Sequence, residues 1–356
     1  MRFSVSIVPS GRQFGVLRDE TILSAALRDN IGLPYGCKDG ACGSCKCKLL
    51  EGRVIHGAHQ QKALSDQEEA QGYVLTCCAT PQTDVVLEAR QVVGLNDHPV
   101  QKMPVRVTSL HKAAPDVMVI HLQLPATHQF NYHAGQFVEF ILPGGIRRSY
   151  SMANAPHTTQ LPLAVEGMQV APVMKGVELH IRHMPGGVFT DQVFNQMKPK
   201  DILRMEGPMG SFFVRADSPR PMVLLASGTG FAPIKAILEH LQHVGSTRPA
   251  HLYWGCRSKQ DLYLHDWAQS MAQTLPWLTY TPVLSEPRAD DAWRGRQGLV
   301  HQAVLQDHPD LSGFDVYACG APVMVDAARQ DFNSQAGLPT DQFYADAFTS
   351  ERDKLA

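Results

Sequence analysis

One stretch decides the fold of this chain: Gly36-Cys37-Lys38-Asp39-Gly40-Ala41-Cys42-Gly43-Ser44-Cys45, which Cys77 follows thirty-two residues later. The spacing C-x4-C-x2-C with one distant cysteine is that of a [2Fe-2S] site held by four thiolates. Glycines in such a loop allow positive φ angles and leave room for backbone N–H groups to reach the sulfides. Zinc ribbons favour two C-x2-C pairs, whereas only Cys42 and Cys45 form one here, so we expect a cluster rather than zinc. The expected ligands are Cys37, Cys42, Cys45 and Cys77.

The other cysteines are expected to be free thiols, namely Cys47, Cys78, Cys256 and Cys319. Three cysteines within nine residues of a 356-residue chain do not resemble a small disulfide-stapled domain. Reduced thiols favour a cytoplasmic location.

Composition places the chain among ordinary globular proteins. Its length predicts two or three domains, and 44% hydrophobic residues supply a core for each. A net charge of −2 gives no basic field for nucleic acid. The N-terminus lacks the apolar core of a signal peptide, and no apolar run approaches a membrane span, so we expect neither. The sixteen histidines form no H-E-x-x-H motif, and we expect no histidine metal site.

The elements around the cysteine loop are strand, strand, helix, loop, strand, short helix and strand. Alternating runs at 3–8 and 13–17 predict a hairpin, 21–29 a helix, 48–50 and 54–55 strands, and Ser65 to Glu68 a capping box. This is a β-grasp order, and residues 35–81 resemble plant-type ferredoxins. In that pattern Leu75-Thr76-Cys77 marks the fourth ligand, so the resemblance favours Cys77 over the adjacent Cys78.

Charge distinguishes this segment from freely diffusing ferredoxins, which typically present a strong acidic field. Its first 98 residues hold ten basic and eleven acidic side chains. A covalently tethered electron donor explains that balance, because a fixed partner has a high effective concentration without electrostatic steering. The segment from Gly94 to Pro99 has neither the helical nor the strand periodicity of apolar residues, which indicates a linker to the next domain.

Beyond the linker, the pattern first predicts an antiparallel barrel and then an α/β domain. Alternating runs at 105–107, 117–124, 136–142, 146–152 and 177–184 are typical of barrel strands. From about residue 220, apolar strands at 222–226, 251–254, 278–284 and 315–319 alternate with helical stretches, which predicts a doubly wound parallel sheet. The expected domains are 1–95, 103–217 and 218–356.

Two motifs in the barrel resemble those of ferredoxin-reductase-type FAD domains: Arg148-Ser149-Tyr150-Ser151 and Pro185-Gly186-Gly187-Val188-Phe189-Thr190. A flavin pyrophosphate needs a guanidinium and free N–H groups, which Arg148 and the helix after Gly187 would supply, with Thr190 adding a hydroxyl. The resemblance implies that Tyr150 stacks on the isoalloxazine ring and that Ser151 bonds near flavin N5. Arg182 is expected to reach the flavin edge, with a solvated strand arginine as the alternative.

A third motif, Ser227-Gly228-Thr229-Gly230-Phe231-Ala232-Pro233, follows a strand and opens a helix. It resembles the reductase family's G-T-G-x-A-P, in which Gly228 and Gly230 let the backbone approach a pyridine dinucleotide and Thr229 positions the nicotinamide. Pro233 suits helix position N1. Downstream, Cys319-Gly320-Ala321-Pro322 resembles the family's Cys-Gly-x-Pro, whose cysteine lies near the nicotinamide.

The two ends of the dinucleotide carry less specific signals. Arg257 and Lys259 are candidates for the adenosine ribose or a 2′-phosphate, with solvated loop charges as the alternative, and Asp261 favours NADH. The tail from Gln342 to Phe348 resembles the family segment that covers the flavin, with Phe348 as the shielding aromatic. An edge strand with core aromatics is the equal alternative.

Taken together, the whole chain resembles the ferredoxin-fused, FAD-containing reductases of bacterial oxygenases and of deoxysugar dehydratases, closest in appearance to CDP-6-deoxy-Δ3,4-glucoseen reductase. The resemblance implies an enzyme in which NAD(P)H delivers a hydride to FAD, which passes electrons one at a time to the cluster and then to an acceptor protein. The expected catalytic residues are Ser151, Thr229, Cys319 and Phe348. We expect a monomer. The alternative to an enzyme is a flavin and cluster redox sensor or binding module that turns over poorly. Cys47, and a long connection at 157–176, depart from the family pattern.

Overall fold

The structure is a computed structural model that describes residues 2–89, 93–94, 98–162 and 173–349. The chain divides into two compact units. The first is Met1–Asp97 with Gly210–Phe212 and Ala345–Ala356, and the second is His98–Met209 with Phe213–Tyr344. Each unit is described by itself.

The first unit is built on a five-stranded sheet in the order β2-β1-β8-β4-β6. Its strands are β1 (Arg2–Val8), β2 (Arg12–Leu17), β4 (Lys46–Glu51), β6 (Tyr73–Leu75) and β8 (Val85–Glu88). Two short ladders accompany it, β3 (Ile31–Gly32) with β9 (Val93–Gly94) and β5 (Val54–His56) with β7 (Ala79–Pro81). The helices are α1 (Ile22–Arg28) and α2 (Asp66–Ala70). Strand β1 pairs antiparallel with β2 and parallel with β8, which is the β-grasp arrangement.

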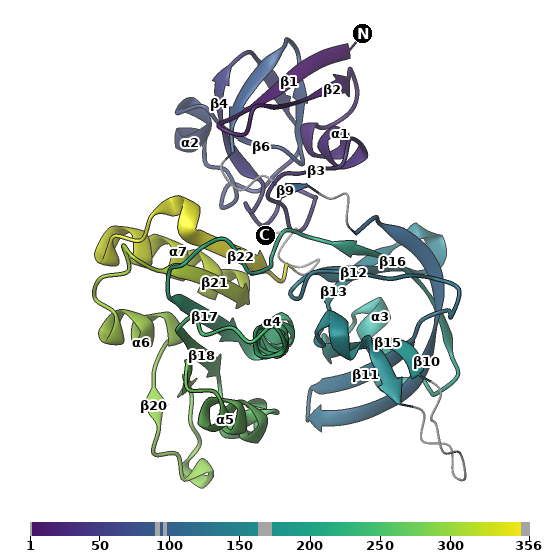
Figure 1. Cartoon of the computed structure of the whole chain (residues 1–356), viewed down its shortest axis with the longest axis vertical. Helices are drawn as coiled ribbons and strands as arrows, with labels where there is room; N and C mark the ends of the chain where they lie inside the picture. The colour runs from purple at the N-terminus through teal and green to yellow at the C-terminus, as the bar shows by residue number, and fades with distance from the viewer. Residues whose placement is uncertain (1, 90–92, 95–97, 163–172, 350–356) are drawn as a thin grey trace. The chain divides into compact units, whose positions relative to one another are not determined.

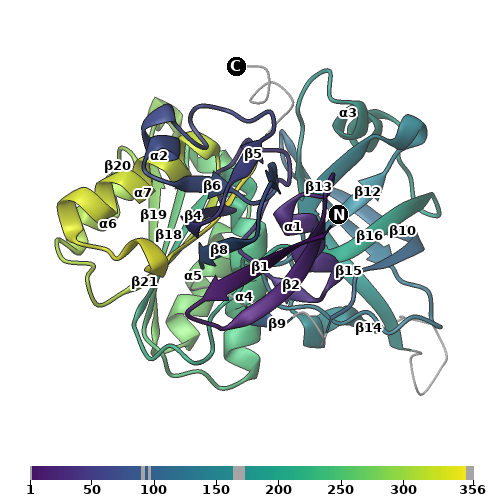
Figure 2. The ribbon, with the colours of Figure 1, turned by 90° about the horizontal axis from the view of Figure 1, so that it is seen from above.

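Local sequence explains these elements. Strands β1 and β2 lie side by side in Figure 2 as the predicted hairpin. Thr21 caps α1 by accepting a hydrogen bond from Ser24 N. Ser65 and Glu68 form the predicted capping box of α2, each side chain accepting from the other residue's backbone N–H. The helices therefore begin where the sequence indicated.

The N-terminal part of the second unit is an antiparallel barrel in the order β13-β12-β16-β10-β11-β15-β14. Its strands are β10 (Gln101–Ala114), β11 (Val117–Gln123), β12 (Phe137–Ile141), β13 (Arg147–Ser151), β14 (Gln160–Pro162), β15 (Val173–Arg182) and β16 (Ile202–Met209). An antiparallel bridge between Met152 and Leu179 joins β13 to β15 and closes the barrel. Helix α3 (Val188–Asn195) follows β15, with Phe189 and Val193 in the barrel core.

The C-terminal part of the same unit is a six-stranded sheet in the order β20-β19-β18-β17-β21-β22. Its strands are β17 (Met222–Ser227), β18 (Ala250–Cys256), β19 (Leu278–Leu284), β20 (Arg296–Gln297), β21 (Asp315–Gly320) and β22 (Phe343–Ala347). The first five pair in parallel. The helices are α4 (Phe231–His243), α5 (His265–Thr274), α6 (Val300–Asp307) and α7 (Pro322–Ala336). Parallel strands alternating with helices match the predicted doubly wound fold.

Short 3₁₀ turns connect several of these elements: η1 (Pro143–Gly145), η2 (Pro156–Thr159), η3 (Gly228–Gly230), η4 (Lys259–Asp261), η5 (Ala289–Asp291) and η6 (Thr340–Gln342). Turn η3 runs directly into α4, so Pro233 is the third residue of the helix rather than the predicted first. Proline is still accommodated, because the first-turn N–H groups of a helix have no intrahelical partner.

Two sequence predictions remain partly outside this description. Most of the predicted long connection at 157–176 lies outside the described residues, which resume at Val173. The predicted domain limits stay predictions. Among the described residues, none of the helices has the length and apolarity needed to cross a membrane.

Candidate functional site: cluster, flavin and nucleotide elements

The cysteine loop brings the four predicted ligands into two pairs. Cys37 N donates to Cys42 Sγ at 3.4 Å, and Cys45 Sγ lies 3.2 Å from Cys77 Sγ. In the described residues no three histidine, cysteine, aspartate or glutamate side chains are grouped to hold one metal ion, so these thiols are not gathered around a single atom. The Cys37 and Cys42 side chains are also hydrogen-bonded to each other, so the four thiols form two pairs, which fits a donor set divided between the two irons of a [2Fe-2S] cluster. The predicted positive φ angles occur at Gly40 and Gly43.

The remaining thiols of this unit have other surroundings. Cys78 Sγ lies 3.4 Å from Cys77 Sγ, on the side of Gly40, where an added Cβ would approach it to 2.8 Å. Cys47 is buried in β4, and burial raises the pKa of its thiol to about 12. Cys47 is therefore a protonated core side chain.

Sequence reasoning missed one contact beside the loop. Tyr35, the residue before Gly36, accepts a hydrogen bond from Gly210 N at 2.7 Å through its hydroxyl. Its own backbone N–H donates to Ser211 Oγ at 2.9 Å. Residues 210–212 thus pack on the first unit although they follow the last barrel strand.

The flavin motif lies on β13, whose alternation separates its side chains. Arg148 and Tyr150 share one face, and burial raises the pKa of the Tyr150 phenol, so it stays protonated. Ser149 lies on the other face and donates to Glu139 Oε1 at 3.4 Å. Ser151 is buried at the end of the strand. The structure therefore separates Ser149 from Arg148 and Tyr150.

The second flavin motif meets the first through two aromatic rings. The Tyr150 ring centroid lies 5.3 Å from that of Phe189, in the first turn of α3. Helix α3 begins after Gly187, which offers no side-chain cap, so an anion can accept from its first N–H groups. The Thr190 hydroxyl donates to Met184 O at 2.8 Å, and Gly186 N donates to Asp191 Oδ2 at 3.1 Å. Val188 is exposed at the helix start. Arg148 and these amides fit an FAD pyrophosphate.

The nucleotide motif forms a tight turn held by an indole. Trp254 Nε1 donates to Gly228 O at 3.0 Å, and the Trp254 ring stacks on Phe231 at 3.9 Å between centroids. A Cβ on Gly228 would lie 2.7 Å from Arg182 Nη1, and a Cβ on Gly230 would lie 2.1 Å from Cys319 O. Gly230 is therefore required by close approach of the Cys319 backbone, Gly228 is favoured by its φ of 53°, and Thr229 is buried between them. Sequence reasoning missed Trp254, because a tryptophan in a strand reads as core.

The structure also places the Cys-Gly-x-Pro motif beside this turn. Ala321 N donates to Ser227 Oγ at 2.9 Å, and Gly320 has a φ of 134°. Cys319 is fully buried. Arg182 pairs with Asp116 at 2.9 Å (Nε to Oδ2) while lying against Gly228. The barrel and the nucleotide turn thus meet at Arg182.

Of the residues predicted to bind the adenosine end of the dinucleotide, two make hydrogen bonds within the protein and the third is an exposed arginine. Asp261 Oδ2 accepts from Ser258 N and Ser258 Oγ, both at 3.0 Å, so this oxygen serves the turn after β18. Lys259 N donates to Asp291 Oδ2 at 3.2 Å. Arg257 is exposed. The inference of NADH from Asp261 therefore stays a prediction.

The tail residues form the sixth strand of the sheet. Phe343 and Tyr344 are buried in β22, and Tyr344 stacks on Tyr317 with 4.7 Å between centroids. This is the edge strand with core aromatics that the sequence left open. Phe348 follows β22 and is half-buried, and its predicted role over the flavin stays a prediction.

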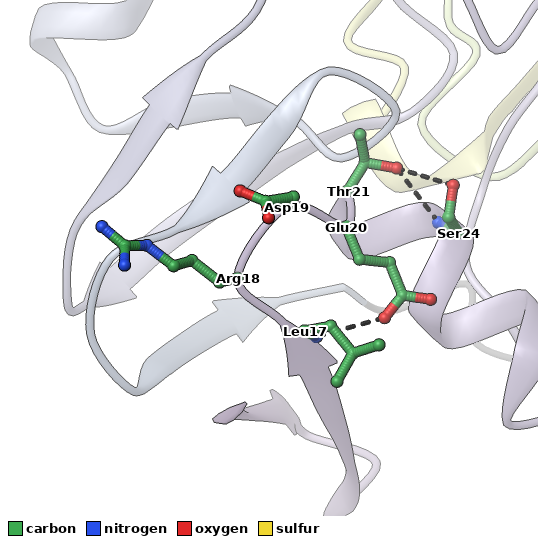
Figure 3. A pocket seen from close by; sticks show the side chains of 6 residues that line it. All are labelled: Leu17, Arg18, Asp19, Glu20, Thr21 and Ser24. Carbon is green, nitrogen blue, oxygen red and sulfur yellow. Dashed lines mark hydrogen bonds between the residues drawn. The ribbon is translucent and has the colours of Figure 1, made fainter. Parts of the chain in front are cut away.

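A surface hollow elsewhere on the first unit contains none of these residues. It lies at the junction of β2 and α1, and Figure 3 shows its lining side chains, Leu17, Arg18, Asp19, Glu20, Thr21 and Ser24. Glu20 Oε2 accepts from Leu17 N at 3.1 Å, and Thr21 Oγ1 donates to Ser24 Oγ at 2.8 Å. Its polar groups serve the turn and the helix cap.

Family models match each of the three segments. Residues 5–82 match a 2Fe-2S iron-sulfur cluster binding domain, residues 104–214 an oxidoreductase FAD-binding domain, and residues 224–330 an oxidoreductase NAD-binding domain. The chain therefore carries binding domains for all three expected cofactors.

Known proteins are similar over the whole length. The chain is 40% identical over 352 residues to CDP-6-deoxy-L-threo-D-glycero-4-hexulose-3-dehydrase reductase of Yersinia pseudotuberculosis, covering 99% of this chain and 100% of that one. It is 34% identical over 333 residues to the phenol 2-monooxygenase reductase component DmpP of a Pseudomonas species, covering 92% and 89%. The crystal structure of the Amycolatopsis cytochrome P450 reductase GcoB has a TM-score of 0.74 at 31% identity, covering 98% and 99%.

These relatives are reductases or reductase components, and their likeness extends through every cofactor domain. The chain is thus an NAD(P)H-dependent oxidoreductase that passes electrons through FAD and a [2Fe-2S] cluster to a partner. It belongs to the family of ferredoxin-fused FAD reductases that includes the hexulose-3-dehydrase reductases and the oxygenase reductase components.

Proposed function

We propose that the acceptor of this reductase is a 3-dehydrase acting on a CDP-linked 6-deoxyhexulose. The observation that supports it is the 40% identity to a reductase of that name, maintained over 99% of the chain. The oxygenase reductase component from Pseudomonas is less similar, at 34% over 92% of the chain. A terminal oxygenase is therefore the second candidate acceptor.

Within this function, we assign the cluster to Cys37, Cys42, Cys45 and Cys77. Their arrangement as two pairs supports the assignment, since each iron needs two protein thiolates. Cys42 and Cys45 are buried, which shields them from solvent, whereas Cys37 is half-exposed at the loop surface.

We assign the FAD pyrophosphate to Arg148 and the first turn of α3, Gly187 to Phe189. When bound, FAD supplies the step from two-electron hydride chemistry to one-electron transfer. The internal hydrogen bonds of Thr190 hold the preceding loop in shape, so Thr190 acts by positioning backbone N–H groups. Tyr150 offers a protonated aromatic face, and Ser151 a hydroxyl at the end of the same strand.

We assign the nicotinamide end of NAD(P)H to the turn Gly228–Gly230, with Cys319 and Gly320 packed directly beside it. The place of this turn between the end of β17 and the start of α4 supports the assignment, because a dinucleotide binds where a parallel strand leads into a helix N-terminus. Trp254 fixes the shape of the turn by donating to the Gly228 carbonyl.

The decisive experiment compares two acceptors. The purified holoprotein is mixed with NADH and either a CDP-6-deoxyhexulose 3-dehydrase with its substrate or a terminal oxygenase with its own. We expect product formation with the dehydrase to exceed that with the oxygenase at least tenfold. The opposite order would assign the protein to oxygenase chemistry.

A cluster-deficient variant, Cys42→Ser, provides the matched control. It should retain reduction of ferricyanide, which accepts electrons from the flavin, and lose delivery to the protein acceptor. If Cys42→Ser still drives the dehydrase at the wild-type rate, the cluster is not the exit point.

A further inference from the structure

Strand β15 has two chemically different faces. Val177, Leu179 and Ile181 point into the barrel core. Glu178, His180 and Arg182 alternate with them and therefore share the outer face. All three meet the nucleotide-binding part of the same unit, since Glu178 contacts Lys235, His180 contacts Tyr263, and Arg182 lies against Gly228.

Lys235 is the centre of this contact. It lies in the second turn of α4 with its side chain 9% exposed, which is unusual for a lysine. Its Nζ lies 2.6 Å from Glu239 Oε1 and 3.3 Å from Glu178 Oε1, and it donates to Ala153 O at 3.1 Å. One buried cation on α4, the helix labelled in Figure 1, thus contacts two segments of the flavin barrel.

Glu239 adds a second attachment one helical turn further on. While its Oε1 binds Lys235, its Oε2 accepts from Ala155 N at 2.9 Å. The carboxylate therefore connects the helix to the barrel segment that follows Ser151. Replacing it by an amide leaves a single acceptor oxygen for two donors.

Neutral and charged partners complete the network. Burial lowers the pKa of His180, so its neutral ring donates from Nε2 to Glu178 at 2.7 Å and accepts at Nδ1 from the Tyr263 hydroxyl at 2.9 Å. Burial alone would favour a protonated Glu178, but hydrogen bonds from His121 and His180 and the charge of Lys235 hold its pKa well below the usual range. Glu178 is consequently charged at neutral pH.

The network is adjacent in sequence to both halves of the proposed hydride-transfer site. Ala153 is two residues beyond Ser151, at the flavin side. Lys235 is in the helix that begins directly after Gly230, at the nucleotide side. A rigid connection between these points fixes how the glycine turn faces the end of β13.

We propose that Lys235 and Glu239 are positioning residues for hydride transfer, which lock α4 to the segment Ala153–Ala155 and so set the nicotinamide-binding turn against the flavin edge. This inference rests on the proposed assignment of Ser151 and Gly228–Gly230. Misplacement of a reacting group by about 1 Å can cost about a hundredfold in rate. An ion pair that fixes the two cofactor-binding segments relative to each other would therefore have a large effect on the rate of hydride transfer.

The test uses Glu239→Gln in the FAD- and cluster-loaded protein. Stopped-flow mixing with a series of NADH concentrations separates the limiting rate of flavin reduction from the half-saturating concentration. We expect the limiting rate to fall at least tenfold and the half-saturating concentration to change less than threefold. Amide hydrogen exchange without NADH should be faster across 153–156, which reports the lock independently of activity.

Two further variants control for folding. Asp307→Asn weakens an ion pair with Arg296 that lies wholly in the nucleotide-binding part, and it should leave the rate and the exchange at 153–156 unchanged. Lys235→Gln removes the other partner of the ion pair. If the Glu239→Gln protein does not retain FAD, Lys235→Gln takes its place, and we expect it to show the same fall in the limiting rate. The proposal is overturned by a limiting rate within twofold of wild type, by unchanged exchange at 153–156, or by equal slowing in Asp307→Asn.

Failure of the underlying site assignment has a different signature. Ser151→Ala and Thr229→Ala, measured in the same way, should each lower the limiting rate. If both leave it unchanged while Glu239→Gln speeds exchange, the site assignment is wrong although the lock exists.

Discussion

Cys77 and Cys78 are neighbours in sequence, but their sulfur atoms have different surroundings. Cys77 Sγ lies 3.2 Å from Cys45 Sγ, whereas Cys78 Sγ lies towards Gly40. Both cysteines lie in the turn after β6, where Cys78 N donates to Leu75 O at 3.0 Å, and the Cys77 sulfur is the one hydrogen-bonded to Cys45. We therefore propose Cys77, which lies next to Cys45, as the fourth ligand.

We expect Cys77→Ser to abolish the visible absorption of the cluster and to reduce bound iron from about two per chain to nearly none. Cys78→Ser should retain both. Iron analysis and absorption spectra check this, with the FAD content of each variant as the control. Loss of the cluster only in Cys78→Ser would reverse the ligand assignment.

Arg257 is exposed after β18, where the second strand of a dinucleotide-binding sheet presents the ribose-binding residue. We expect Arg257→Ala to raise KM for the nucleotide about fivefold with little change in kcat, because an exposed charge-assisted hydrogen bond contributes about 1 kcal/mol. Steady-state kinetics with NADH and NADPH check this. The matched variant Lys259→Ala should have a smaller effect, since Lys259 contacts Asp291. Equal KM values for wild type and Arg257→Ala would make Arg257 a solvated loop charge.

For single residues, the sequence predicts a role that depends on spacing along the chain. It does not predict a role that depends on the burial of the side chain in the folded protein. The cysteine loop and the capping box of α2 follow from local patterns. Lys235 and Glu239 are four apart on a helix, which in sequence reads as an exposed ion pair. Only the packing of the barrel on α4 buries them.

Strand β21 begins with a buried ion pair that connects this strand to the segment between the barrel and β17. Asp315 is fully buried and contacts Arg248 Nη2. Arg248 also donates to the carbonyls of Arg215 and Arg220, in the segment between the barrel and β17. The pair thus holds the entry to the parallel sheet.

We expect Asp315→Asn to lower the free energy of unfolding by about 3 kcal/mol, because it leaves a buried guanidinium without its counter-charge. Urea unfolding followed by tryptophan emission measures this. In comparison, Asp307→Asn, at a more exposed ion pair, should cost about 0–1 kcal/mol. Similar losses in the two variants would contradict a special role for burial.

Element types and order follow from the sequence, whereas their ends do not. Strand β10 extends from Gln101 to Ala114, although alternation predicted only 105–107, because its polar outer positions still pair with β11 and β16. The helix after the glycine motif begins two residues before Pro233, since η3 supplies a preformed turn. In both cases tertiary pairing extends an element beyond its local signal.

For the whole molecule, buried histidines set the response to acid. Burial lowers the pKa of several histidines, that of His251 to about 4, and the others are His56, His157, His180, His240, His301 and His308. The unfolded chain binds protons at these groups near pH 6.5, so between about pH 6.5 and pH 4 it binds more protons than the folded chain. Folding stability therefore decreases as the pH falls through this window.

We expect the free energy of unfolding to be greatest above about pH 6.5 and to fall steadily towards pH 4, with a further loss below about pH 4.5, where Glu178 binds a proton in the unfolded chain while it stays charged in the folded one. Urea midpoints at several pH values measure this. His251→Gln should make the fall shallower between pH 6.5 and pH 4. Stability that rises on acidification in this window would contradict the argument.

The order of domains was readable from the sequence because each carries a motif that fixes backbone chemistry. The cysteine spacing, the Arg-x-Tyr-Ser strand and the glycine turn match the three family models in the same order. The lock between barrel and nucleotide turn was not readable, because it depends on contacts such as Lys235 Nζ with Ala153 O across 82 residues of sequence.

The indole of Trp254, which fixes the Gly228 carbonyl, gives the protein an internal optical probe. The four tryptophans of the chain are Trp254, Trp267, Trp277 and Trp293, so they are confined to the nucleotide-binding part. Trp254 stacks on Phe231 at the first residue of α4. Indole emission, followed with the non-reducing dinucleotide NAD⁺, would report docking at that turn, while visible absorption after mixing with NADH follows the flavin and the iron. Tryptophan emission and visible absorption therefore allow binding of the nucleotide and its oxidation to be measured separately in the same protein.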